Sequence, residues 1–339
     1  MVRRRGPVAD GPYGKIPAVV SVATLEVSRL TRTFRTGREV IRALEDIDLE
    51  VDAGEIVGVL GLNGAGKTTM LKVVSTLLLP SGGTVRVGGH DVVRETGAAR
   101  RLLSVIFGGD RGLYLRLSGR DNVRFFGTLS GLSRREVAAR VDPALEQVGL
   151  AQAASRPVET YSRGMRQRLH LAIGLLSTPR LLMLDEPTIG LDPLEAERLR
   201  GSIAALRGSG TAVLLTSHYL GDIERLAGRI VVLERGRVTH DLPLARLLER
   251  AGAAAEVALT GRGPAPPLDG EAREGIRLLR LTMGTPTPET WTITFEVKEW
   301  APASLRELAS LWPEAEVTDV RVLPVSLEQV FSELARRAT

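Results

Sequence analysis

Residues 55–68 read Glu-Ile-Val-Gly-Val-Leu-Gly-Leu-Asn-Gly-Ala-Gly-Lys-Thr, and this stretch decides the fold. The first six residues form an almost wholly apolar run, as expected for a strand that is buried on both faces. The next eight fit the pattern G-x-x-x-x-G-K-[ST] without a mismatch. Glycines there let backbone N–H groups turn toward phosphate oxygens, and the lysine neutralises their charge. The stretch therefore predicts a strand, a phosphate-binding loop and a helix in succession.

The rest of the core alternates between strand and helix patterns. Short apolar runs like the first one lie at 180–184, 211–215 and 229–233. Helix-period segments lie at about 67–78, 164–177, 194–207 and 220–227. Strands that are apolar on both faces are typical of a parallel sheet with helices on each side. The alternation predicts a doubly wound α/β core within residues 23–241.

Residues 112–160 interrupt this core with helical sequence. Ser133 and Glu136 have the spacing of a capping box at a helix start. Apolar residues follow at helical spacing, from Val137 to Val148. We therefore expect a helical insert at about 112–165.

The pattern changes again after Asp241. We expect a helix at 242–251, a turn-rich loop at 261–270, strands at 277–283, 290–297 and 317–324, and helices at 303–311 and 326–337. This mixture predicts a small C-terminal α+β accessory domain over residues 242–339. We expect residues 1–22 to form a disordered basic leader.

Composition excludes several classes of protein. The 339 residues include no cysteine, which removes disulfides, thiolate catalysis and cysteine-ligated metals. No apolar run approaches the roughly 20 residues that span a bilayer. The net charge of +5 suits nucleic acid or anionic lipid, but the arginines are spread along the chain and only 4% of residues are aromatic. Because a stacking platform needs aromatic side chains, we expect no nucleic-acid partner.

Two carboxylates follow the apolar run at 181–184. Ligands of α/β folds bind at the carboxyl edge of the sheet, where Asp185 and Glu186 would lie. Asp185 is then a candidate to hold a metal ion and Glu186 to polarise an attacking water. Alone, the pair also fits a solvated turn before Pro187, but the phosphate loop favours the catalytic interpretation.

Five motifs in order make the chain similar to the ATP-binding subunits of ABC transporters. Between the phosphate loop and the Asp185–Glu186 pair, Tyr161-Ser-Arg-Gly-Met165 stands in the place of the family's signature sequence. After the pair come Gly190-Leu-Asp-Pro193, in the place of the D-loop, and Thr216-Ser-His218, with the switch histidine. The resemblance covers residues 25–240. It implies a P-loop ATPase core with an antiparallel β subdomain and a helical insert.

The resemblance also implies the ligands and the site. ATP, with Mg²⁺, would lie between the phosphate loop of one copy and the signature of a second copy. The implied nucleotide-binding residues are Phe34, Gly61, Asn63, Gly64, Gly66, Lys67, Thr68, Thr69, Ser162, Gly164 and Asp192. The implied catalytic residues are Glu186, His218 and Lys67, and the implied metal ligands are Thr68 and Asp185. Phe34 fits both an adenine-stacking role and an ordinary strand position.

Two departures from the family pattern affect these roles. Arg163 and Met165 replace the usual first glycine and the glutamine of the signature, while Ser162 and Gly164 remain. Gly109 stands where the family usually has the Q-loop glutamine, with Asp110 beside it. We expect phosphate binding at the signature to survive, whereas Gly109 in place of the glutamine leaves the coupling to a membrane partner open.

The tail favours one subtype. Residues 318–331 look like the end of the C-terminal extension on drug-exporter ATPases of the daunorubicin-resistance kind, although an amphipathic helix that packs on the domain explains the same residues. We therefore expect an ATPase subunit that powers export of a drug, antibiotic or lipid through a separate permease, at the cytoplasmic face of the membrane. The alternatives are a protein of the same family that acts on ribosomes or DNA, and an importer subunit, which the tail disfavours.

Overall fold

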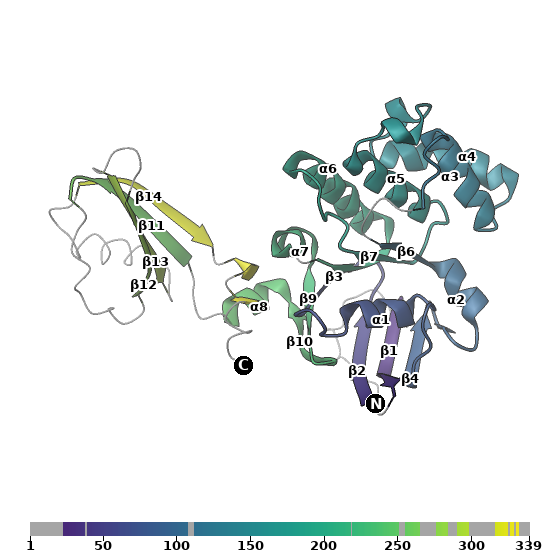
Figure 1. The fold of residues 1–339 in the computed structure, drawn as a ribbon, viewed down its shortest axis with the longest axis horizontal. Helices are drawn as coiled ribbons and strands as arrows, with labels where there is room; N and C mark the ends of the chain where they lie inside the picture. The colour runs from purple at the N-terminus through teal and green to yellow at the C-terminus, as the bar shows by residue number, and fades with distance from the viewer. Residues whose placement is uncertain are drawn as a thin grey trace, which may run out of the picture.

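The computed structural model describes residues 23–37, 39–107, 112–217, 219–250, 255–264, 276–283, 290–297, 316–324, 326–328 and 330–331. Figure 1 shows a central sheet with helices above it and a second sheet below it, while a third sheet stands to one side. The expected leader at 1–22 and the expected helix at 303–311 lie outside the described residues.

The central sheet has the strand order β10-β9-β3-β8-β7-β6. Its strands are β3 (Ile56–Leu60), β6 (Leu103–Phe107), β7 (Leu181–Asp185), β8 (Ala212–Thr216), β9 (Arg229–Glu234) and β10 (Arg237–Pro243). All pairs among β3 and β6 to β9 are parallel, and β10 is antiparallel to β9. Every residue of β3 and β8 is buried. The parallel, doubly covered sheet expected from the apolar runs is confirmed.

Alternate residues of each strand enter two different cores. Ile56 and Leu60 of β3 pack in one cluster, and Val57 and Val59 pack in the other. The first cluster contains helices α3 (Gly119–Leu129), α4 (Arg134–Gln147), α5 (Arg163–Leu175), α6 (Pro193–Ala204), α7 (Leu220–Leu226) and α8 (Leu244–Arg250). The second contains α1 (Lys67–Val74), α2 (Thr96–Leu102) and the antiparallel sheet. The central sheet is therefore the middle layer of three.

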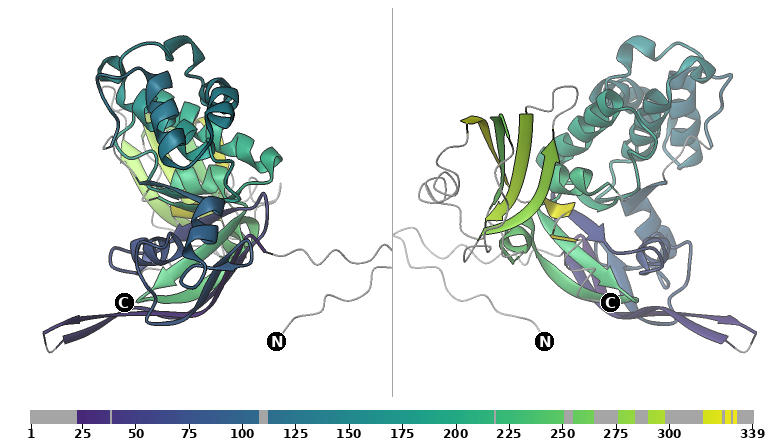
Figure 2. Two further views of the ribbon diagram at one scale, coloured as in Figure 1. Left: turned by 90° about the vertical axis from the view of Figure 1, so that its right-hand side faces the viewer. Right: turned by 60° about the vertical axis from the view of Figure 1, so that its left-hand side comes forward.

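The antiparallel sheet has the order β2-β1-β4-β5. Its strands are β1 (Leu25–Thr36), β2 (Glu39–Val51), β4 (Gly82–Val87) and β5 (His90–Asp91). In β2, Ile47, Leu49 and Val51 are buried and the acidic residues between them are not, which produces the alternation seen in the sequence. Figure 2 shows that the β1–β2 hairpin extends well beyond the rest of this sheet.

The helical insert contains α3 and α4 and two short 3₁₀ turns, Ala151–Ala153 and Val158–Thr160. The capping box of α4 is present. The Glu136 N–H donates to Ser133 Oγ at 3.3 Å, and the Ser133 N–H donates to Glu136 Oε2 at 2.9 Å. The insert leads directly into α5, whose N-cap is Ser162.

The third sheet has the order β12-β13-β11-β14 and is antiparallel. Its strands are β11 (Ala255–Arg262), β12 (Ile276–Met283), β13 (Thr290–Val297) and β14 (Glu316–Pro324). The expected strands correspond to β12, β13 and β14 within one residue. Of the terminal helix expected at 326–337, the structure describes residues 326–328 and 330–331, and helical residues are among them.

Strand β11 was missing from the sequence expectation. Gly261 and Arg262 were assigned to a loop, but they end this strand. Gly261 serves packing rather than a turn, because a Cβ there would lie 2.1 Å from Cζ2 of the buried Trp291. The helix expected from residue 242 begins at Leu244, because Leu242 and Pro243 still pair with β9.

A close helix–strand contact before the phosphate loop can be tested. A Cβ at Gly58 of β3 would lie 2.6 Å from Ile223 Cγ2 and 3.1 Å from Ala227 Cβ. We expect Gly58→Ala to lower the free energy of unfolding by about 1–3 kcal/mol through overpacking. The exposed helical Gly201 has open space around it, so Gly201→Ala is the control and should be neutral or stabilising by up to about 1 kcal/mol. Urea denaturation measures both, and equal effects would contradict the packing argument.

Candidate active site

The loop between β3 and α1 is built around glycines. Gly61, Gly64 and Gly66 all have positive φ angles. A Cβ at Gly61 would lie 2.4 Å from the Leu233 carbonyl oxygen, and one at Gly66 would lie 2.6 Å from the Ala43 carbonyl oxygen. The backbone can therefore follow this path only with glycine at positions 61 and 66.

The loop ends at an uncapped helix N-terminus. Gly66 is the N-cap of α1. Its backbone is left-handed, and no side chain accepts a hydrogen bond from the first N–H groups of the helix. The first N–H groups of a helix have no intrahelical acceptor, and they carry the positive end of the helix dipole. Thr68 is exposed in this first turn, and Thr69 is half-buried beside it. This arrangement fits a bound phosphate group.

Lys67 is the first residue of α1, and its side chain bonds back to the loop. Its Nζ donates to the Gly61 carbonyl oxygen at 2.5 Å and to the Leu62 carbonyl oxygen at 3.3 Å. Burial lowers the pKa of Lys67, and the nearby charges of Glu186 and Asp185 oppose that shift. The ammonium group is thus held beside the position that an anion would take.

Asp185 and Glu186 stand at the carboxyl end of β7. Asp185 pairs with Thr216 of β8, and the Thr216 hydroxyl donates to Asp185 Oδ1 at 2.6 Å. The Glu186 N–H donates to the Thr216 carbonyl oxygen at 3.0 Å. Glu186 has a φ of 53°, a left-handed conformation that is unfavourable for a residue with a Cβ. The chain therefore turns sharply at the residue expected to polarise water.

Thr68 and Asp185 are the two expected metal ligands. Mg²⁺ prefers oxygen ligands, and this site offers a hydroxyl and a carboxylate. Thr216 donates to one carboxylate oxygen of Asp185, and no described hydrogen bond engages the other oxygen. The residues present therefore fit a hard divalent cation.

The signature segment forms a second helix N-terminus. Ser162 caps α5, and its Oγ accepts from the Met165 N–H at 3.1 Å. A Cβ at Gly164 would lie 2.4 Å from Glu195 Oε2, so this glycine allows α5 and α6 to approach closely. Glu195 in turn pairs with the buried Arg168 at 3.0 Å. Arg163, a departure from the family pattern, donates to the Gly190 carbonyl oxygen at 3.3 Å.

The two helix N-termini lie in different parts of the fold. Figure 1 shows α1 against the antiparallel sheet, whereas α5 lies with the helical insert. Among the hydrogen bonds and ion pairs of the described residues, none joins 61–69 to 162–165. The structure therefore does not bring the two predicted halves of the nucleotide site together within one copy of the chain.

The other predicted residues are placed as follows. The Asp192 carboxylate caps α6 and accepts from the Leu194 and Glu195 N–H groups, both at 3.0 Å. Phe34 lies on β1, with the Arg32 guanidinium carbon 4.5 Å from its ring centroid. Asn63 and Gly64 are exposed in the phosphate loop. His218, Gly109 and Asp110 lie outside the described residues.

A buried polar cluster was not predicted from the sequence. Asp222 on α7 is fully buried and contacts Thr188, Arg200 and Ser217. In the sequence, Asp222 looks like an acidic residue in the first turn of a helix, and such a residue is normally solvated. Only the tertiary structure shows that three other segments converge on it.

Comparison with known proteins identifies the family. The ABC transporter family matches residues 44–189. NatA of Bacillus subtilis strain 168, named as an ABC transporter ATP-binding protein, is 36% identical over 219 residues, which are 65% of this chain and 89% of that protein. The chain belongs to the ABC transporter family as an ATP-binding subunit, and it is an ATPase.

Other relatives support the drug-exporter resemblance. A daunorubicin resistance ATP-binding protein, DrrA3 of Streptomyces coeruleorubidus, is 47% identical over 58% of this chain. A daunorubicin/doxorubicin resistance ATP-binding protein, DrrA of Streptomyces peucetius, is 44% identical over 63%. The alignments span 62% and 63% of the two Streptomyces proteins.

Solved structures confirm the fold. One, described as an ATP-binding subunit of an ABC transporter, has a TM-score of 0.58 and 31% identity, covering 68% of this chain and 93% of that one. A dimeric post-hydrolysis ATP-binding cassette, MJ0796 with ADP and Pi, has a TM-score of 0.57 and 26% identity, covering 65% and 98%. None of the described helices is both long and apolar enough to cross a membrane.

The role of Lys67 can be tested by nucleotide binding. We expect Lys67→Ala to raise the Kd for ATP by about 10-fold or more, because a charge-assisted hydrogen bond contributes about 1.5–3 kcal/mol. Lys72→Ala, in the last turn of the same helix, is the matched control and should leave the Kd unchanged. Fluorescent-nucleotide titration measures both. Equal affinity of Lys67→Ala and the unaltered chain would refute the role given to Lys67.

Proposed function

We propose that two copies of this chain bind ATP between them and hydrolyse it to power export through a separate membrane permease. One observation carries the dimer: each copy contains two helix N-termini suited to phosphate, at Gly66 and Ser162, and they lie in different parts of the fold. A head-to-tail pair would place the N-terminus of α5 of one copy against the phosphate loop of the other. ATP would then be bound from both sides.

Within this site the residues divide the chemistry. The phosphate-loop amides and Lys67 bind and orient the β- and γ-phosphates, and Ser162 and Gly164 of the second copy meet the γ-phosphate. Thr68 and Asp185 would hold Mg²⁺, which would supply charge neutralisation at the phosphates. Glu186 accepts a proton from the attacking water, and His218 hydrogen-bonds the γ-phosphate. Phe34 stacks on adenine. Asp192 contributes to nucleotide binding at the interface between the two copies, and it also caps α6.

An apolar surface on the helical insert supports docking to a permease. Tyr114 and Phe125 pack edge to face at 4.8 Å, and Phe125 and Phe126 do so at 5.3 Å. Tyr114, Phe125 and Leu129 are 49%, 39% and 71% exposed. Exposed apolar side chains gathered in this way mark protein interaction sites. We propose that they contact a permease and hold the ATPase at the cytoplasmic face of the membrane.

The direction of transport and the cargo class rest on relatives. Proteins named for daunorubicin, doxorubicin and linearmycin resistance are 33–47% identical to this chain over 58–65% of its length. Their names support export of an antibiotic-like compound. The chain would consist of an ATPase domain at 23–241 and an accessory domain at 242–339, while the permease selects the cargo.

Replacement of the proposed base tests both hydrolysis and dimerisation. We expect Glu186→Gln to lower kcat by about 100-fold or more, because general base catalysis contributes on that order, while ATP still binds. The ATP-bound variant should then persist as a dimer in light scattering, because hydrolysis no longer opens it. The unaltered chain with ADP is the control and should be monomeric. A monomer under saturating ATP would count against the proposed dimer.

The docking surface can be tested separately. We expect Leu129→Asp to lower co-purification with the permease by about 10-fold, because it buries a charge in an apolar contact. Leu79→Asp, 65% exposed and outside the insert, is the matched control. ATPase activity of the isolated subunit should stay unchanged in both. Undiminished recovery of permease with Leu129→Asp would contradict docking at this surface.

A further inference from the structure

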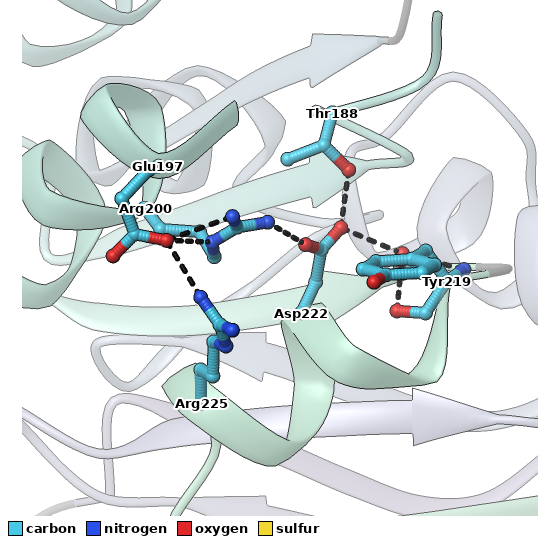
Figure 3. Close-up of polar contacts among 7 residues, drawn as sticks. Thr188, Glu197, Arg200, Tyr219, Asp222 and Arg225 are labelled. Carbon is cyan, nitrogen blue, oxygen red and sulfur yellow. Dashed lines mark hydrogen bonds and ion pairs between the residues drawn. The ribbon is translucent and has the colours of Figure 1, made fainter. Parts of the chain in front are cut away.

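Asp222 is a fully buried carboxylate at the start of α7. Its Oδ1 accepts from Arg200 Nη1 at 2.7 Å. Its Oδ2 accepts from the Thr188 hydroxyl and, at 3.1 Å, from the Ser217 hydroxyl. A buried charge is costly unless it is paired and hydrogen-bonded, and here both oxygens are satisfied. Figure 3 shows Thr188 and Arg200 approaching Asp222 from different directions.

The three donors come from three segments of the site. Thr188 lies two residues after Glu186, and Ser217 directly precedes His218. Arg200 lies on α6, the helix that Asp192 caps. The Ser217 hydroxyl also accepts from the Tyr219 N–H at 3.0 Å. One carboxylate thus joins the segment that carries the proposed base to α6 and to Ser217, which directly follows β8.

The charge of Asp222 is balanced by a chain of ion pairs that runs to the surface. Arg200 Nη2 pairs with Glu197 at 2.8 Å, and Arg225 Nη1 pairs with the same Glu197 oxygen at 2.6 Å. Burial lowers the pKa of Arg200, but hydrogen bonds to Glu197 and Asp222 outweigh it and leave that pKa raised. Arg200 therefore stays charged, and the buried end of the chain is tightly held. Its outer end, Glu197 and Arg225, is exposed and more weakly coupled.

The backbone of Glu186 is strained, and the contacts of Asp222 help to hold it. Glu186 holds a left-handed φ of 53°, and such a conformation persists only where the surroundings determine it. The Glu186 N–H is fixed by Thr216, and the Thr188 hydroxyl is fixed by Asp222 two residues later. The turn is thus anchored on both sides of Pro187. The anchor after the turn, Asp222, also accepts a hydrogen bond from Ser217.

We propose that Asp222, through Thr188, is a positioning residue that sets Glu186 for ATP hydrolysis. It touches no substrate itself. The inference rests on the proposed role of Glu186. It adds that one buried carboxylate holds the turn that carries Glu186, so loss of the Thr188 hydrogen bond at this carboxylate disturbs the proposed base.

The sharpest test removes one hydroxyl. Thr188→Val keeps the shape of the side chain but not its donor, whereas Thr188→Ser keeps the donor. We expect Thr188→Val to lower kcat by about 10- to 100-fold, as small misplacements of catalytic groups do, with the Kd for ATP within about twofold. Thr188→Ser should restore most of kcat. Arg225→Ala, at the exposed end of the ion-pair chain, is the control and should keep normal kcat.

A double-mutant cycle separates this proposal from the proposed function. In a Glu186→Gln background, Thr188→Val should lower kcat much less than it does alone, because the group that it positions has been removed. Fully additive losses would overturn the coupling, and so would normal kcat of Thr188→Val in a chain whose Glu186→Gln variant is inactive. If Glu186→Gln itself retained full turnover, the role of Glu186 in the proposed function would fail, and this inference with it. Thermal melting of each variant excludes unfolding as the cause of lost turnover.

Discussion

The adjacency of β3, β8 and β7 in the central sheet is the constraint on which the site depends. Because these strands are parallel, their carboxyl ends meet at one edge of the sheet. The phosphate loop, Thr216 and the two carboxylates therefore lie together there, although they are far apart in the sequence. Thr216 links the segments directly, since its hydroxyl holds Asp185 and its carbonyl holds Glu186. The two cores on either side then fix the sheet, as alternate residues of each strand enter different layers.

Much of this could be predicted from the sequence because the signals are local. Strands such as β3 and β8 are continuous apolar runs, and the helix starts at Ser133 and Ser162 carry their own caps. The phosphate loop is specific because few sequences place glycines and a lysine at this spacing. The accessory sheet was predicted less well. Gly261 has the composition of a turn, and only the ring of Trp291 across the sheet explains why a glycine ends a strand there.

The parts of the site that could not be predicted depend on tertiary contacts. Nothing near Asp222 in the sequence indicates that Thr188, Arg200 and Ser217 will enclose it, because these residues come from separate segments. The ion pair between Arg168 and Glu195, next to Gly164, also depends on a tertiary contact between two helices. Motifs identify the groups that meet a ligand, whereas the residues that hold these groups in place are defined by packing.

The accessory sheet is connected to the ATPase core at two places. The chain leaves the core through α8, and after β14 it returns, where Leu327 and Val330 are buried in the same cluster as α7 and α8. The Leu327 N–H also donates to Glu224 of α7 at 3.4 Å. A domain attached to its neighbour at two points has fewer possible orientations than one on a single linker. The second attachment lies on α7, the same helix that bears Asp222.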